Sequence, residues 1–572
     1  TARETPQSVT SLDSLRMQEQ GLTDISEVMA QIVGIQTNRS SALGTDGTNY
    51  TARGFAVQNY LVDGVARPSN IYGFTEDTAD MIAYDRIEVI RGSAGMMTGT
   101  GEPSAAINMI RKRPGADLSA TIAATIGSWD KYRLEGDIGG ALTASGHIRA
   151  RVAGAWQDND TFIDREHAKR QALYGVIEAD LGPSTLLTAG IEYQNFRNEG
   201  ASRGGVPLFF TDGTKTDFAR STNGGANWSD FSRKSVNIFA SIAHDFDTNW
   251  HLQVDAEHKS GSYDETIGYY FGTAIDKETG DGGTFYATRW ASDLTLDAVY
   301  ANLRGAFEAL GQEQHVALTV SHTRFDDDQT PYPGWWGGSD YMYPINAYSY
   351  FPTGDVAKPD LTPSGGTAGN RIETSSIAGV ARLKPIGPLS IIAGGRLTWW
   401  KQDSYAQDVT GPKVWSPVVD EKAVFTPYAG LVLDFTKTLS AYVSYASVFT
   451  PQTSRTVDGD VIAPLEGNTY EAGLKADFLD GRLSATAAVF KMQQDNYALA
   501  DGPGIFAPTT KVHLFRLINV FGQQGWYYLQ VMATRPAPAD DAVLVDQRDV
   551  HHLRSGGIVG VVGKAQPADL GE

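Results

Sequence analysis

The sequence predicts a transmembrane antiparallel β-barrel preceded by a small N-terminal domain of mixed α/β structure. Three observations support this fold class. From about residue 118 the chain repeats strand, turn and strand, with apolar and polar residues alternating along the strands. Aromatic residues gather at strand ends, as they do at the two interfaces of a barrel in lipid. Short turns alternate with long loops, which is the asymmetry of an outer-membrane barrel.

One strand shows the alternation clearly. Ile148, Val152 and Trp156 fall on one face, and Arg149 and Arg151 on the other, because successive side chains of a strand point to opposite faces. Apolar faces of this kind are often built of Ala, Gly and Val, whereas a water-soluble core would carry larger side chains. A large soluble β-sandwich or β-helix stays open as an alternative, since it would show the same alternation.

The chain divides into three parts. Residues 1–117 form the N-terminal domain, residues 118–507 hold about fifteen strand candidates, and residues 508–572 are atypical. The aromatic residues at strand ends are Trp156, Tyr193, Trp290, Trp399 and Trp400.

Composition excludes several classes of function. The 572 residues include no cysteine, which excludes disulfides, thiolate metal sites and a cysteine nucleophile. The net charge of −20 argues against a nucleic-acid partner. No run of about 18 apolar residues occurs, so no transmembrane helix is expected. No nucleophile with a neighbouring base and no metal-ligand spacing is visible, so we expect no enzyme, no catalytic residue and no bound metal.

The N-terminal domain is predicted to mix short strands with one or two short helices within residues 14–29. Asp63-Gly64 is a hairpin turn signal. Strands are expected at residues 8–10, 32–37, 50–55 and 59–64.

The stretch from Asp85 to Arg113 holds four glycines between two short strands. Such density indicates backbone in unusual conformations or approached closely by another part of the molecule. Gly99-Thr-Gly101 is not a dinucleotide motif, because Pro103 and a short strand follow where that motif needs a long helix.

Long loops are predicted around residues 197–231, 261–295 and 326–370, and recognition usually resides in such loops. The segment from Asp326 to Phe351 is both acidic and aromatic. Its three leading aspartates could bind a cation through oxygen ligands, but a solvated acidic run is the simpler interpretation.

Several segments resemble the family of TonB-dependent outer-membrane siderophore receptors, of the ferric-coprogen, ferrichrome and pyoverdine type. They cover the chain from its start to about residue 505. They are ETPQSVT (4–10), RGF (53–55), NYLVDGV (59–65), YDRIEVIRGSAGMMTGTGEPSAAINMIRKRP (84–114), YVSYASVFTPQT (442–453) and NTYEAGLKADFLDGRLSATAAVFKMQQDN (468–496).

The resemblance implies that the N-terminal domain is a plug inside the barrel lumen. It also implies that Arg53 and Arg91 pair with glutamates of the barrel wall, of which Glu471 is one. Arginine suits this role because its planar fork holds a carboxylate bidentately. The alternative is that each arginine pairs with a carboxylate nearby in the plug, for example Arg91 with Glu88.

The function implied by the resemblance is import of a ferric siderophore across the bacterial outer membrane. The TonB protein of the inner membrane would supply the energy, outer-membrane lipid would surround the barrel, and iron would travel as the siderophore complex. The ligand-contacting residues we predict are Arg67, Tyr72, Trp335, Trp336 and Tyr341. Other expectations kept open are another solute (cobalamin, haem or a saccharide), a passive porin or adhesin, and a non-functional product.

The sequence departs from the family pattern at both ends. After about Pro508 it does not alternate as strands should, and a plugged transporter of this kind has about 22 strands. We therefore expect the barrel to be incomplete at its C-terminal end, through truncation, deletion or a shifted reading frame. No signal peptide and no segment for engaging TonB is recognisable before the plug, and the second wall glutamate is not found. His551-His552 has no partner that would make a metal site.

Overall fold

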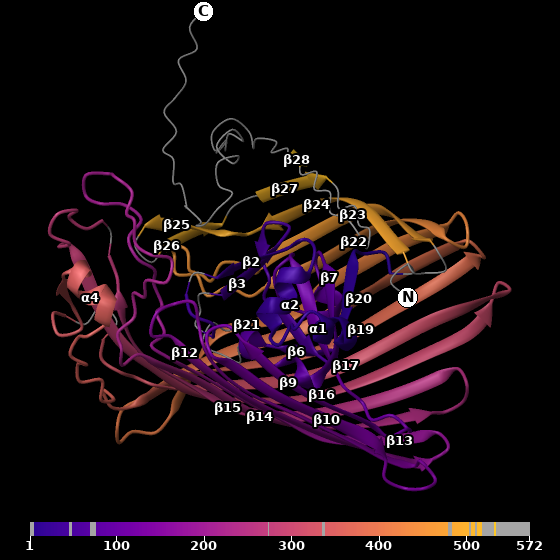
Figure 1. Ribbon diagram of the computed structural model, residues 1–572. Helices are drawn as coiled ribbons and strands as arrows, with labels where there is room; N and C mark the ends of the chain where they lie inside the picture. The colour runs from indigo at the N-terminus through magenta and orange to yellow at the C-terminus, as the bar shows by residue number, and fades with distance from the viewer. Residues whose placement is uncertain are drawn as a thin grey trace, which may run out of the picture.

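The computed structural model describes residues 5–39, 41–44, 48–68, 76–272, 274–334, 338–478, 483–502, 505–508, 512–517 and 531–532. A large antiparallel sheet curls around the N-terminal domain, which lies inside the curve of the barrel (Figure 1). We call the N-terminal domain the plug and the surrounding sheet the wall. No helix in these ranges has the length and apolar character needed to cross a membrane.

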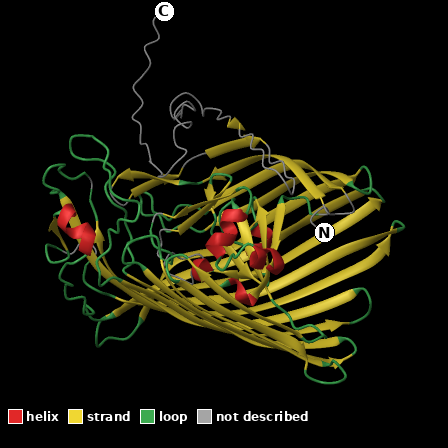
Figure 2. Ribbon diagram, viewed as in Figure 1, coloured by secondary structure: helices red, strands yellow, loops and turns green. Residues whose placement is uncertain are grey.

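The plug contains two small sheets and short helices (Figure 2). The five-stranded sheet has the order β1-β7-β8-β5-β6, and β5 runs parallel to β8. Its strands are β1 (Val9–Asp13), β5 (Asn59–Val62), β6 (Val65–Arg67), β7 (Tyr84–Arg91) and β8 (Ala105–Arg111). The second sheet is β2 (Ile35–Arg39), β3 (Thr48–Ala52) and β4 (Phe55–Ala56). The helices are α1 (Ser14–Glu19), α2 (Ile25–Gln31) and α3 (Gly95–Thr98), with 3-10 helices η1 (Glu76–Thr78) and η2 (Met81–Ala83).

Local sequence explains these plug elements. Asp24 caps α2, and Glu27 completes a capping box, so two of the free backbone donors of the first turn are satisfied. The predicted hairpin turn is confirmed, with Asp63 at φ 50° and Gly64 at φ 83° joining β5 to β6. The single strand expected at 50–55 is instead two, because Arg53 (φ 55°) and Gly54 (φ 89°) turn the chain between β3 and β4.

The wall is one antiparallel sheet. Its strands are β9 (Ser119–Gly127), β10 (Lys131–Ala141), β11 (Ile148–Asp160), β12 (His167–Gly182), β13 (Thr185–Glu199), β14 (Asp230–Asp245), β15 (Trp250–Tyr270), β16 (Gly283–Ala309), β17 (Gln312–Thr330), β19 (Thr367–Ile386), β20 (Leu389–Gln407), β21 (Val414–Asp434), β22 (Leu439–Thr450), β23 (Leu465–Phe478), β24 (Leu483–Asp495), β27 (Val512–Leu517) and β28 (Val531–Met532). The order of neighbours from β10 through β28 to β9 is that of a closed barrel.

The strands at the C-terminal end of the sheet are short, and their neighbour order closes the circle, where the sequence led us to expect an incomplete barrel. The strands that complete the circle, β27 and β28, have 6 and 2 residues, whereas β11 to β17 have between 13 and 27. Strand β27 pairs with Val489–Gln494, six positions of β24, and with β28 at Arg516 and Leu517.

The wall strands point apolar residues outward and polar residues inward. On β11, Ile148, Val152 and Trp156 are 37%, 49% and 44% exposed on the outer surface, while Arg149 and Arg151 bond to lumen-side carboxylates. An outward apolar face is what a bilayer requires of a barrel. The inward polar face of the wall lies against the plug.

The long connections gather at one end of the barrel, around α4 (Ala347–Thr353) and β18 (Met342–Ile345) (Figure 1). The loop predicted over 261–295 is much shorter, because β15 and β16 continue as a ladder up to the pair Tyr270 and Phe285. Aromatic residues explain the difference, since cross-strand aromatic pairs stabilise a ladder. Two further short strands, β25 (Ala498–Gly502) and β26 (Ile505–Pro508), form a hairpin.

The glycine-rich stretch of the plug packs directly against the wall. A Cβ added to Gly95 in α3 would lie 2.4 Å from the carbonyl oxygen of Ser447 and 2.9 Å from the Cα of Val448, both on β22. For Gly95 the approaching partner is therefore the barrel backbone, whereas wall side chains approach Gly99 and the plug side chain of Asn59 approaches Gly101.

We predict that Gly95→Ala displaces α3 from β22. Overpacking of this kind costs about 1–3 kcal/mol, so the amides of Thr98 and Gly99, which bond to Ala94 and Gly95, should exchange with deuterium roughly tenfold faster or more. The control is Gly182→Ala, which meets nothing within 4 Å. Unchanged exchange at Thr98 and Gly99 would contradict the prediction.

Candidate ligand site

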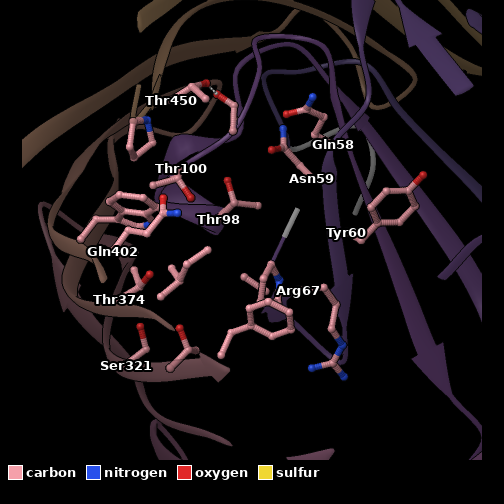
Figure 3. A pocket seen from close by; sticks show the side chains of 18 of the residues that line it. Gln58, Asn59, Tyr60, Arg67, Thr98, Thr100, Ser321, Thr374, Gln402 and Thr450 are labelled. Carbon is pink, nitrogen blue, oxygen red and sulfur yellow. Dashed lines mark hydrogen bonds between the residues drawn. The ribbon is translucent and has the colours of Figure 1, made fainter. Parts of the chain in front are cut away.

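A cavity of about 450 Å³ lies between the plug and the wall (Figure 3). It is at the end of the plug nearest the long loops, because its lining includes Gln329 and Thr450 at the loop ends of β17 and β22. Its volume is in the range of sites that take small organic ligands. The plug contributes Gln58, Asn59, Tyr60, Ala66, Arg67, Pro68, Thr98, Thr100 and Gly101. The wall and its loop ends contribute Tyr300, Ser321, Thr323, Phe325, Gln329, Asn370, Ile372, Thr374, Arg396, Trp400, Gln402, Thr450 and Pro451.

Strand alternation places the wall residues of this cavity. Ser321, Thr323 and Phe325 are every second residue of β17, so all three face the lumen. The same period on β20 points Arg396, Trp400 and Gln402 inward. The plug side is formed by the β5–β6 hairpin and by the residues that follow α3 (Figure 3).

The cavity lining is polar and aromatic, with an excess of positive charge. Amides and hydroxyls dominate, and Tyr300, Phe325 and Trp400 offer ring faces or edges. Among the described lining residues two are arginines, Arg67 and Arg396, and none is aspartate or glutamate. The arrangement suits a ligand that carries negative charge and planar groups.

Arg67, which we predicted as a ligand contact, lines the cavity but is already paired. Its guanidinium binds Glu257 of β15 and lies 3.8 Å from Glu76. Burial acts to lower the pKa of Arg67, but Glu257 and Glu76 outweigh it and raise the pKa. The positive charge of Arg67 is therefore largely offset in this structure.

The other four predicted ligand contacts are not among the described residues that line the cavity. Tyr72, Trp335 and Trp336 are outside the described residues. Tyr341 does not line the cavity; it lies in the long loop and donates a hydrogen bond to the carbonyl of Asp360. Their role in ligand contact stays a prediction.

The acidic run of the sequence belongs to strand β17 and not to a loop. Asp326 pairs with Arg324 and Arg371, and Asp328 pairs with Lys413 and accepts a bond from Tyr405. Within the described ranges, no group of three or more His, Asp or Glu side chains is arranged to hold a metal ion.

Arg53 and Glu471 meet at the plug–wall boundary. Their side chains form a buried ion pair, with 3% and 1% of their surfaces exposed. The left-handed backbone at Arg53 turns the hairpin tip toward the wall, where the guanidinium also lies 4.1 Å from the centre of the Phe490 ring. Glu471 accepts further bonds from Ser8 and Tyr442.

Arg91 is fully buried and bonds within the plug. Its guanidinium donates to Thr10 Oγ1 at 2.8 Å and to the carbonyl oxygen of Val33. Glu88, the local alternative, pairs with Arg86 instead. The part that Arg53, Arg91 and Glu471 play in fastening the plug stays a prediction.

The N-terminal segment of the plug is held by β23. Lys475 Nζ donates to the carbonyl oxygens of Thr5 and Gln7, at 2.5 and 2.7 Å. Pro6 packs against Gly430 of β21, where a Cβ would lie 2.5 Å from the proline ring.

Sequence reasoning missed Arg396 and Glu257, and placed Trp400 with the strand-end aromatics. Trp399 is 38% exposed on the outer surface, while its neighbour Trp400 lines the cavity. The alternation along β20 could have distinguished the two tryptophans, because Trp400 lies an even number of residues from Arg396 and so shares its face, whereas Trp399 does not.

A barrel with apolar outer faces, a folded plug in its lumen and a polar cavity at the loop end of that plug defines a plugged outer-membrane receptor. The chain belongs to the TonB-dependent receptor family. The family described as TonB dependent receptor-like, beta-barrel matches residues 173–526, and the TonB-dependent receptor plug domain matches residues 1–106. The barrel match extends past residue 508, where the sequence was expected to stop resembling the family.

The chain is similar to pyoverdine receptors of Pseudomonas. It is 34% identical over 507 residues to the ferripyoverdine receptor of Pseudomonas aeruginosa. The aligned region covers 88% of this chain and 60% of that receptor. The chain is 31% identical over 534 residues to the ferric-pyoverdine BN7/BN8 receptor of Pseudomonas putida, covering 92% and 65%. The chain thus spans less than two thirds of these relatives.

A solved structure has the same fold. The crystal structure of the ferripyoverdine receptor of the Pseudomonas aeruginosa outer membrane, bound to ferripyoverdine, superposes with a TM-score of 0.83 at 31% identity. The superposition covers 93% of this chain and 70% of that one. Like its homologues, the protein is an outer-membrane β-barrel.

We predict that Glu471→Gln loosens the β3–β4 hairpin from the wall. The change leaves Arg53 buried without its carboxylate, and breaking one side of a buried pair costs about 3–5 kcal/mol. Hydrogen exchange of the β3 and β4 amides measures the loss. The control is Glu88→Gln, because Arg86, its partner, is 41% exposed and such pairs contribute less than about 1 kcal/mol. Equal effects of the two changes would contradict the prediction.

Proposed function

We propose that this protein is a TonB-dependent outer-membrane receptor that imports a ferric siderophore, and that it is not an enzyme. Iron is the cargo, carried inside the siderophore complex, and the protein itself holds no cofactor. Its partners are the ferric siderophore, the TonB protein of the inner membrane and the lipid around the barrel.

The observation that carries the proposal is the cavity at the loop end of the plug. Its described lining has no carboxylate and two arginines, of which Arg67 is paired with Glu257 behind the lining. Ring faces and many neutral hydrogen-bonding groups complete the lining. Ferric siderophores combine planar chelating groups with oxygen-rich surfaces, which these side chains complement. The pyoverdine receptors to which the chain is similar add support for this class of cargo.

Transport needs the plug to rearrange, because the plug fills the lumen. Besides non-covalent packing, the plug and wall are joined by ion pairs and hydrogen bonds such as Arg53 with Glu471 and Lys112 with Asp137. No disulfide can form in a chain without cysteine. The plug is therefore attached by contacts that can be broken and remade, and energy delivered through TonB would break them.

The proposed function predicts siderophore uptake that depends on an energised inner membrane. The protein would be expressed in a bacterial strain whose native siderophore receptors have been deleted. The cells would then be given radioactive iron as ferric pyoverdine and as other ferric siderophores. We expect uptake of at least one complex and its loss when the proton gradient is collapsed.

Other outcomes of the uptake experiment favour other functions. Uptake that survives collapse of the gradient would indicate a passive porin. Binding of cobalamin, haem or a saccharide, with no ferric siderophore bound, would indicate the same machine with another cargo. Failure to bind any of them would overturn the proposal and indicate a non-functional product.

We predict that Trp400→Ala weakens binding of the ferric siderophore by about 30-fold, which corresponds to roughly 2 kcal/mol for truncation of a buried aromatic contact. Quenching of protein fluorescence by the ferric complex measures the affinity. Trp399→Ala is the matched control, because the adjacent ring points outward and should leave the affinity within about twofold. A larger effect at Trp399 than at Trp400 would contradict the assignment of the cavity.

A further inference from the structure

Arg396 differs from most of the other buried arginines of the plug and wall in the groups that it bonds to. It is 3% exposed and lines the cavity from β20. Among the residues that the structure describes, its hydrogen-bond partners are all neutral: Ser376 Oγ at 2.6 Å, Met97 O at 2.7 Å, Ser321 Oγ at 3.1 Å and Met96 O at 3.4 Å. Its Nε has no hydrogen-bond partner there.

Carboxylates offset the charge of most comparable arginines. Each of the following has one within 4 Å: Arg53, Arg67, Arg111, Arg133, Arg170 and Arg233. No described carboxylate is paired with Arg396 in this way. A buried charge without a counter-charge is costly, so its retention at a cavity points to an anion that arrives from outside.

Arg396 also connects the cavity to the plug. Its Nη1 donates to the carbonyl oxygens of Met96 and Met97, in the four-residue helix α3. Ser321, which receives a bond from Nη2, is a lining residue in its own right (Figure 3). An oxyanion that binds the guanidinium competes with these neutral acceptors for its N–H groups, because charge-assisted hydrogen bonds are the stronger ones.

We propose that Arg396 selects the cargo by charge, by binding an oxyanion of the ferric chelate in exchange for its bonds to the carbonyls of α3. The proposal rests on the proposed function and adds the class of cargo, an anionic ferric chelate in preference to a neutral one. It also links ligand binding to the plug, since an anion that binds the guanidinium weakens one attachment of α3 to the wall. Ligand binding and release of α3 are therefore coupled, and release of α3 favours ligand binding to the same extent.

The test compares the binding of two ferric complexes, one anionic and one neutral. One is ferric pyoverdine prepared with a free carboxylate side chain, and the other is a neutral ferric trihydroxamate, in which three hydroxamates balance the ferric ion. We expect Arg396→Gln to weaken binding of the anionic probe at least about tenfold and to change binding of the neutral probe less than about twofold. Arg396→Lys, which keeps the charge, should retain part of the preference.

The coupling has a separate readout. Hydrogen exchange of the Thr98 and Gly99 amides should speed up in the unaltered protein when the anionic probe binds, and should not respond to that probe in Arg396→Gln. Arg324→Gln is the matched control, since Arg324 is 42% exposed on its strand and pairs with Asp326. It should leave the preference between the probes unchanged.

Three results would overturn the inference. Equal weakening of both probes in Arg396→Gln would show a role in folding alone. Faster exchange at Thr98 and Gly99 in Arg396→Gln without any probe, combined with an unchanged preference, would show that the residue only anchors α3. Binding of neither probe by the unaltered protein, while another solute binds, would overturn the proposed function and this inference with it.

Discussion

The inward face of the wall is polar, and this constraint governs the rest of the structure. A bilayer requires apolar residues outside, so strand alternation places amides, hydroxyls and charges in the lumen. Buried polar groups must find partners, and the plug supplies them. Arg133 of β10 binds Asp80 of the plug, and Tyr174 of β12 bonds to the carbonyl of Lys112. The plug and the wall therefore satisfy each other's hydrogen-bonding groups.

The same constraint explains why the plug packs closely against the wall and yet can separate from it. Gly95 brings α3 into contact with the backbone of β22, while ion pairs such as Arg53 with Glu471 join the plug to the wall elsewhere. A buried ion pair contributes little net stability compared with apolar packing of similar volume. It does fix the relative orientation of two surfaces, and it permits their separation when either partner finds another counter-charge.

Much of this architecture could be predicted from the sequence. Period-2 alternation identified the wall strands and their outward faces, and Asp63-Gly64 identified a plug hairpin. The ladder of Tyr270 with Phe285 could not be foreseen, because aromatic residues in a loop and in a two-sided strand look alike. The cavity could not be foreseen either. Its lining joins residues as distant as Gln58 and Pro451, and only the register of β17, β19 and β20 against the plug decides which side chains meet there.

The hold on the N-terminal segment has a mechanical consequence. Lys475 bonds to the main-chain carbonyls of Thr5 and Gln7, and β1, which follows, is an edge strand bonded only to β7 within its sheet. Tension applied at residue 5 and directed away from the plug would load these bonds one after another, beginning with Lys475. Hydrogen bonds that bear the force one at a time break at a lower force than hydrogen bonds that share it. Such tension would therefore detach the N-terminal segment and β1 first, while the hydrogen bonds among β7, β8, β5 and β6 remain.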